Sequence, residues 1–266
     1  MARAGFDFGA EVVSGGGKVF KTPEVGDHEA IVSAIVHVGS FQDVFTKGKA
    51  KEIKKPCNYV LVQATLMGAE DKNEDESRME QWLAIALKDG DKATLTKFMN
   101  AVDPKEECAG FSDFIGRAFT VSMVGSGKQG DDGKWQYVNW KGFAGCPDRL
   151  AKLVYTEVES EGIQCIGHVQ FDDITKEILD SIPAYMIRQY FLSEKEGTNL
   201  SYAGSKVEAV INKAREEDPE WKMPRKSDDD DAKPDNKKPL DTGADVPAEV
   251  PAQDVPAPDL DETEEF

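Results

Sequence analysis

The chain has 266 residues and a formal net charge of −18, from 50 acidic and 32 basic residues. Its hydrophobic content of 39% lies below the roughly 45–50% of an average globular domain, so part of the chain is expected to build no core. Overall acidity argues against a nucleic-acid-binding protein, whose binding surface should be basic. The charge is uneven, however. Residues 227–266 hold 14 acidic residues and 3 lysines, a net charge of −11, which leaves −7 for the 226 residues before them.

Flexible and strand-forming segments open the chain. Residues 1–27 are rich in glycine and predict a flexible arm, either loosely docked or in contact with DNA or a neighbouring subunit. Apolar, β-branched segments then predict strands at 29–38, 57–67 and 80–87, the last of which would also suit a helix.

A short amphipathic helix follows these strands. Leu95, Phe98 and Val102 have helical spacing, between a cap at Asp91 and a stop at Pro104. Strands at 117–124 and 134–143 then form a hairpin across a glycine-rich turn.

The order β-β-β-α-β-β is that of an OB-fold, whose helix lies between its third and fourth strands. We therefore predict a mainly β (α+β) protein with a five-stranded OB-fold barrel over residues 28–146. An SH3-like barrel shares much of this pattern. Residues 147–223 predict a mixed, largely helical extension packed on the barrel, and residues 224–266, acidic and proline-rich, predict a disordered tail.

The strongest basic cluster lies between the first two strands. Five lysines and one acid within nine residues give a local charge of +4: Lys47, Lys49, Lys51, Lys54 and Lys55. Lysines neutralise phosphates and release counterions, so the cluster predicts sequence-independent phosphate binding. In an OB-fold this loop is one of two that hold oligonucleotides. The alternative is an ordinary solvated loop.

The fifth strand mixes aromatic and polar residues. Alternation places Trp135, Tyr137, Asn139, Lys141 and Phe143 on one face and Trp140 on the other, toward the core. Trp135 and Tyr137 are the predicted base-stacking residues, with Lys141 on phosphate. The alternative is that both rings are core and Lys141 snorkels. Weaker stacking candidates are Phe41, Phe45, Tyr59 and Trp82.

The glycine-rich turn before this strand contributes Lys128 and Lys134 as further phosphate contacts. It is no P-loop, because Ser122 stands in place of the first glycine and Gln129 in place of Ser or Thr. We find no motif of a hydrolase or metalloprotease and expect no enzymatic activity.

Cysteines and histidines give no sign of a metal or cofactor. The cysteines form no C-x-x-C pair and the histidines lack ligand spacing. We expect reduced intracellular thiols, no cofactor and no metal. Without a run of 18 apolar residues or an apolar N-terminal segment, the chain is expected to be cytoplasmic and to make no membrane contact.

The last residues combine charge with an aromatic end. Acidic side chains precede a terminal ring and carboxylate, which together predict a docking tag for a basic pocket with an apolar floor. Such a tail would also compete with DNA for the lysines. The tag consists of Asp259, Asp261, Glu262, Glu264, Glu265 and Phe266.

In layout and tail, the chain resembles bacteriophage single-stranded DNA-binding proteins with one OB-fold. The resemblance rests on segments such as NYVLVQATL, KATLTKFMNAV and GKWQYVNWKGF within residues 26–147, and on the acidic tail. It implies binding and protection of single-stranded DNA during replication, recombination and repair, in the host cytoplasm. It also implies that the tail recruits replication proteins: a DNA polymerase, a primase or helicase, or an RNA polymerase.

Two other functions fit the same sequence. A strand-annealing or recombination-mediator protein would show annealing activity and ring-like oligomers. A protein-interaction adaptor would use the barrel to bind a protein and show no measurable DNA binding. Homo-oligomerisation is left open by the sequence.

Overall fold

One long strand organises the fold. The computed structural model describes residues 22–47, 50–129, 133 and 135–223. Strand β1 (Gly26–Gln42) runs through the centre, and its residues Ala30–Val38 are buried with the exception of His37. These residues are small or β-branched and, apart from Ser33, apolar, as suits a strand covered on both faces.

The sheet is mainly antiparallel and places β1 in the middle. The order is β5-β4-β1-β6-β7, with the two short strands β8 and β9 also pairing β1. The flanking strands are β4 (Cys57–Leu66), β5 (Glu80–Ala86), β6 (Ala118–Gln129) and β7 (Trp135–Gly145). The predicted mainly β, α+β class is confirmed.

The sheet stays open between its two outer strands. In the part of the chain that the structure describes, no ladder joins β5 to β7, so the predicted closed five-stranded barrel is not established. Helix α1 (Thr94–Val102) packs against β7, β5 and β6 instead. It buries Phe98, Ala101 and Val102, and the helix begins after Ala93 rather than after the predicted Asp91 cap.

Two irregularities bend β1 and change its partner. Register shifts lie between Val32 and Ala34 and between His37 and Gly39. Only the first part of β1, Gly26–Ile31, pairs β6. The later part instead pairs β8 (Gly167–Val169) in parallel and β9 (Thr198–Asn199) in antiparallel orientation. The segment 147–223 thus adds two strands to the same sheet.

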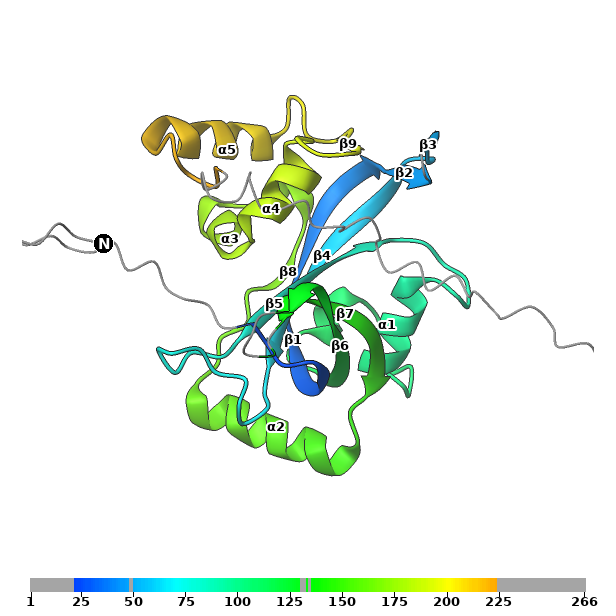
Figure 1. Ribbon diagram of the computed structural model, residues 1–266, viewed down its shortest axis with the longest axis vertical. Coiled ribbons are helices and arrows are strands. Elements are labelled where there is room, and N and C mark those ends of the chain that lie inside the picture. Colours follow the sequence, from blue (N-terminus) through cyan, green and yellow to red (C-terminus); the bar gives the residue numbers. More distant parts are fainter. Residues whose placement is uncertain (1–21, 48–49, 130–132, 134, 224–266) are drawn as a thin grey trace, which may run out of the picture.

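Each face of the central strands has its own core. Val32, Ile35 and Val60 pack on one face, with Phe98 and Phe119. The opposite face, which we call the outer face, is covered by a group of C-terminal elements at one end of the molecule (Figure 1), which we call the C-terminal layer. These are η2 (Phe171–Asp173), α3 (Lys176–Ser181), α4 (Ala184–Met186), the π-helical turn η3 (Ile187–Phe191) and α5 (Lys206–Glu217).

The last described residues are anchored to α3 and the residues that follow it. Trp221 is buried, and its Nε1 donates to the Asp180 carboxylate at 2.6 Å. The Nζ of Lys222 donates to the carbonyl oxygens of Asp180 (2.8 Å) and Ile182 (2.6 Å). These contacts hold the last described residues against α3 and the residues that follow it. No helix in the described residues is long and apolar enough to span a membrane.

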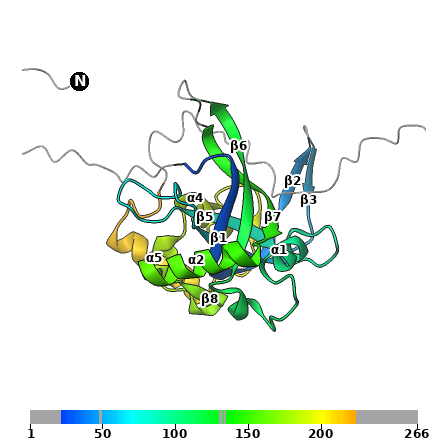
Figure 2. The same ribbon diagram turned by 90° about the horizontal axis from the view of Figure 1, so that it is seen from below.

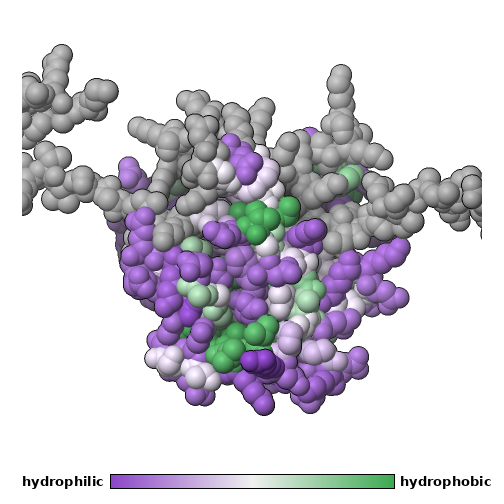
Figure 3. All heavy atoms as spheres, turned by 60° about the horizontal axis from the view of Figure 1, so that its bottom comes forward, coloured by the Kyte–Doolittle hydropathy of each residue, from purple (hydrophilic) through white to green (hydrophobic). Residues whose placement is uncertain are grey.

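Helix α2 (Asp148–Glu161), within the predicted mixed and helical extension, lies at the other end of the molecule (Figure 1). It buries only Val154, while Leu150 and Leu153 stay exposed, so its apolar periodicity is weak. On this side, hydrophobic residues form small separate patches in a mostly hydrophilic surface (Figure 3). The helix ends at Gly162, whose φ of 64° gives a left-handed cap.

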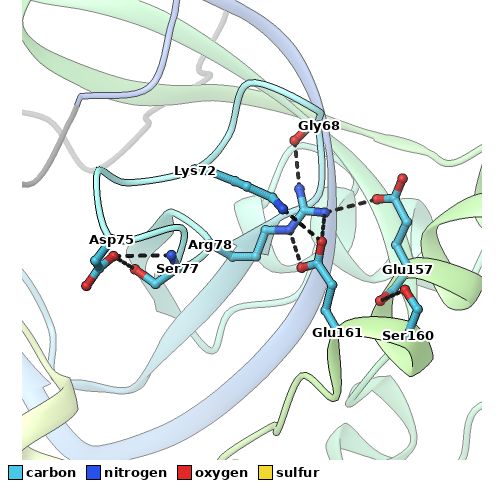
Figure 4. A network of polar contacts seen from close by, with 8 residues as sticks. All are labelled: Gly68, Lys72, Asp75, Ser77, Arg78, Glu157, Ser160 and Glu161. Carbon is cyan, nitrogen blue, oxygen red and sulfur yellow. Dashed lines mark hydrogen bonds and ion pairs between the residues drawn. The ribbon is translucent and has the colours of Figure 1, made fainter.

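An ion-pair network holds the end of α2 against the loop between β4 and β5 (Figure 4). The Arg78 guanidinium donates to both oxygens of Glu161, at 2.8 and 2.7 Å, and to the Gly68 carbonyl at 2.7 Å. Lys72 lies 3.1 Å from the same carboxylate. These cations lower the pKa of Glu161 to about 2, with the Arg78 hydrogen bonds as the main cause. The bidentate geometry fixes the helix end as well as pairing charge.

A second polar contact fixes the start of β1. His28 Nδ1 lies 2.9 Å from both oxygens of the buried Asp71, and Nε2 lies 2.9 Å from the Glu24 carbonyl oxygen. Both ring nitrogens face acceptors, so both carry protons and the ring is an imidazolium. The hydrogen bond to Asp71, opposed by burial, raises the pKa of His28 above 6.5.

We expect stability to fall as pH rises through the raised pKa of His28. Because the folded pKa is raised, this contribution is fully present below about 6.5 and is lost above the folded value. His28→Gln should destabilise the protein by about 2 kcal/mol near pH 6 and flatten the pH dependence. Urea unfolding between pH 5.5 and 9 measures both effects. An NMR titration that gives His28 a pKa below 6.5 would contradict the assignment.

Candidate nucleic-acid interface

The predicted lysine loop is a two-stranded ribbon. β2 (Val44–Lys47) pairs β3 (Ala50–Ile53) in antiparallel register, Val44 opposite Ile53 and Phe45 opposite Glu52. The ribbon is separate from the main sheet and stands off the body (Figure 1). Its strands escaped the sequence analysis because lysine has low strand propensity and hid the alternation.

The lysines of this ribbon differ in how tightly they are held. Lys54 Nζ lies 3.8 Å from the Asp43 carboxylate and 5.0 Å from the centroid of the Phe45 ring. Lys51 Nζ lies 3.3 Å from Glu196 Oε1, with side chains 64% and 41% exposed. Lys55 is exposed. An exposed ion pair adds little stability, so a phosphate can replace Glu196 on Lys51 at low cost.

The hairpin of β6 and β7 forms the second part of the candidate interface. The Trp135 ring lies directly against Gly125, where an added Cβ would come within 2.2 Å of the ring. Asn139 donates to Ser126 Oγ at 2.8 Å across the hairpin. Trp135 and Tyr137 are half-buried and Lys141 is exposed, so both predicted stacking rings keep accessible surface.

A bulge in β7 corrects the predicted alternation. Ser122 pairs Gly142 while Met123 pairs Trp140, so that Lys141 is the extra residue. Beyond it the strand has changed face. Trp140 is buried as predicted, but Phe143 joins the same core, 5.7 Å from the Trp140 ring, and leaves the predicted platform.

Three of the four weaker stacking candidates lie in the core. Phe41, Tyr59 and Trp82 are 1%, 4% and 6% exposed, on the outer face beneath the C-terminal elements. Phe41 contacts Tyr59 and Tyr190, with centroids 5.5 and 5.2 Å away. Burial raises the pKa of Tyr59. A base cannot stack on rings enclosed in this way, so these three residues leave the candidate set; Phe45, on the ribbon, is half-buried.

Several candidate residues lie outside what the structure describes. These are Lys49, Lys134, the side chains of Lys47 and Lys128, the N-terminal arm before residue 22, and the tail tag from Asp259 to Phe266. Their predicted roles stay predictions.

The two hairpins project from the same side of the molecule (Figure 2). One carries Lys51, with Lys54 and Lys55 directly after its second strand, and the other carries Trp135 and Tyr137. A flexible polyanion with flat rings could therefore contact cations on one hairpin and aromatic rings on the other.

Sequence reasoning missed one polar cluster away from these hairpins. His37 and His168, 131 residues apart in the chain, meet with their Nε2 atoms 2.9 Å apart. Spacing rules cannot find such a pair, because only the parallel pairing of β8 with β1 brings it together. Among the described residues, no group of three or more His, Cys, Asp and Glu side chains could hold a metal ion.

Comparisons with protein-family models, with curated proteins and with solved structures gave no match for this chain.

Proposed function

We propose that the protein binds single-stranded DNA without sequence specificity, between the β2–β3 ribbon and the β6–β7 hairpin. The observation that carries the proposal is the strand path. We interpret the order β5-β4-β1-β6-β7, with α1 between β5 and β6 in sequence, as the strand path of an OB-fold that is open between its third and fifth strands. In that fold the ribbon and the hairpin correspond to the two loops that hold oligonucleotides.

The covered outer face limits where the strand can run. In an OB-fold, oligonucleotides also lie across the second and third strands. Here the corresponding strands are β4 and β5, whose outer-face residues Tyr59, Leu61, Trp82 and Ala84 are buried under the C-terminal layer. We therefore place the DNA on the hairpins alone, with Lys51, Lys54 and Lys55 on phosphates and Trp135 and Tyr137 on bases. Each stacked base contributes about 1–3 kcal/mol.

Titration of the full-length protein with oligo(dT) tests the proposal. We expect micromolar or tighter binding at low salt, tryptophan quenching, and an affinity that falls linearly with salt on a double-logarithmic plot. Quenching should disappear in Trp135→Leu, while the Trp221→Phe control, altered only in the C-terminal layer, should keep it. Absence of both quenching and a gel shift at low salt would overturn the proposal.

The acidic tail is assigned two roles within the proposed function: recruiting replication proteins, and competing with DNA for the lysines. The net charge of −11 over residues 227–266 supports the second role. Deletion of residues 227–266 should therefore tighten oligo(dT) binding, most clearly at low salt. Unchanged or weaker affinity after deletion would remove the competing role and leave DNA binding itself intact.

A further inference from the structure

His37 and His168 form a close imidazole pair at the junction of three elements. His37 lies on β1, His168 on β8, and Phe111 of η1 (Phe111–Phe114) flanks both rings. The His37 and His168 ring centroids are 5.1 Å apart, and Phe111 lies 6.0 and 5.8 Å from them. Both histidines are half-buried, so the pair has solvent access.

The surrounding contacts fix the protons of the pair. His168 Nε2 lies 2.9 Å from His37 Nε2 and 3.3 Å from the Gln170 amide nitrogen, which can only donate. His168 Nε2 is therefore the acceptor, and its Nδ1 carries the proton and donates to Ser112 Oγ, 3.0 Å away. An imidazole nitrogen binds a metal ion through the lone pair that it presents when it carries no proton.

We propose that this pair is a binding site for a divalent transition-metal ion of the copper, nickel and zinc class, held by Nε2 of His37 and Nε2 of His168. Two nitrogens bound at about 2.0–2.1 Å and at right angles to each other are about 2.9 Å apart. The Nε2–Nε2 distance of 2.9 Å matches this spacing. Right-angled ligands suit the tetragonal geometry of Cu²⁺ and Ni²⁺, and Cu²⁺ is the ion that nitrogen sites bind most tightly.

Binding requires small changes within the cluster. The proton of His37 moves from Nε2 to Nδ1 by exchange with water, which frees the Nε2 lone pair for the metal ion. Rotation of the Gln170 amide by half a turn presents its oxygen as a third ligand, and water fills the remaining positions. Ser112 keeps its hydrogen bond to His168 Nδ1 and orients the ring. The site is open and differs from a closed cluster of four side chains.

Competing ligands elsewhere in the described chain are weak. His28 already uses both ring nitrogens, on Asp71 and on the Glu24 carbonyl. Burial raises the pKa of the four thiols, Cys57, Cys108, Cys146 and Cys165, which keeps them protonated. A bound ion would join β1 to β8, the strand through which the C-terminal layer begins. The site is independent of the proposed DNA binding.

Calorimetric titration of the full-length protein with CuCl₂, NiCl₂ or ZnCl₂ in a non-chelating buffer at pH 7.5 tests the site. We expect the protein to bind one equivalent of metal ion. This binding should be lost in His37→Ala and in His168→Ala and kept in His28→Gln. Ser112→Ala should weaken binding by about tenfold, because the ring loses its orienting partner. At a hundredfold excess of Cu²⁺ over its Kd, Tm should rise by about 5–10 °C.

Electron paramagnetic resonance of the Cu²⁺-loaded protein provides the second measurement, with hyperfine structure from two imidazole nitrogens expected. The proposal fails if His37→Ala binds the same number of equivalents with the same affinity as the unchanged protein. It also fails if the spectrum shows sulfur or only carboxylate ligands, or if no binding tighter than millimolar is found. His168→Asn keeps a polar side chain on β8 and should also lose the bound metal ion. It tests the site even if the alanine variants fail to fold.

Discussion

Replacing Lys51, Lys54 and Lys55 together by glutamine is expected to weaken oligo(dT) binding by on the order of 100-fold at 0.1 M salt. Each lysine that leaves a phosphate removes about 0.7 from the salt slope for a single strand, so the slope should fall by about 2. Filter binding or fluorescence at four salt concentrations gives both quantities. The salt slope separates lost phosphate contacts from a general loss of fold.

The matched control removes three lysines that lie outside the ribbon. Lys152 and Lys206 are exposed on α2 and α5, and Lys213 is exposed on α5 with only a 3.9 Å pair to Glu217. Their triple glutamine variant should leave the salt slope unchanged. Lys54 also contacts Asp43 and Phe45, and its replacement could disturb the ribbon itself. The double variant Lys51→Gln, Lys55→Gln leaves these contacts in place and should still lower oligo(dT) affinity by on the order of 25-fold. If the triple variant of the ribbon and the triple control variant lose equal oligo(dT) affinity, the assignment of phosphate binding to the ribbon is refuted.

Strands with a continuous apolar signal were predictable from the sequence. The segments 29–38, 57–67 and 80–87 were expected as strands; the first corresponds to part of β1, and the other two cover β4 and β5. Burial on both faces gives these segments their apolar signal, which at 80–87 would equally have suited a helix. The short helix before Pro104 was found for the same reason, because Phe98 and Val102 are buried at helical spacing.

Features that depend on tertiary partners were not predictable. The bulge at Lys141 turns Phe143 into the core, and its only local signal is the neighbouring Gly142 within the strand. The outer-face positions of Tyr59 and Trp82 look like a stacking platform until the C-terminal layer covers them. Aromatic residues on a strand therefore predict burial or binding equally well, and only the elements packed above them decide.

The C-terminal layer and the sheet should unfold as one cooperative unit. Phe191 is fully buried in the core that contains Val38 and Phe41 of β1, Tyr59 of β4 and Trp82 of β5. Phe191→Ala removes most of a ring from this core and leaves a cavity, which costs about 3–5 kcal/mol. Urea unfolding should show a single transition at a lower midpoint with an unchanged m-value. Because the core joins both parts, DNA binding and secondary structure should be lost together.

Leu200→Ala is the matched control, because Leu200 belongs to the same layer but is 53% exposed. It should change stability by no more than about 0.5 kcal/mol. Two transitions in Phe191→Ala, with oligo(dT) binding kept after the first, would show instead that residues 147–223 are a separable domain. In that case the outer face of β4 and β5 would be uncovered in the intermediate, and Tyr59 and Trp82 would return as candidates for base stacking. A single transition leaves the hairpins as the surface, among the described residues, on which we place the proposed DNA binding.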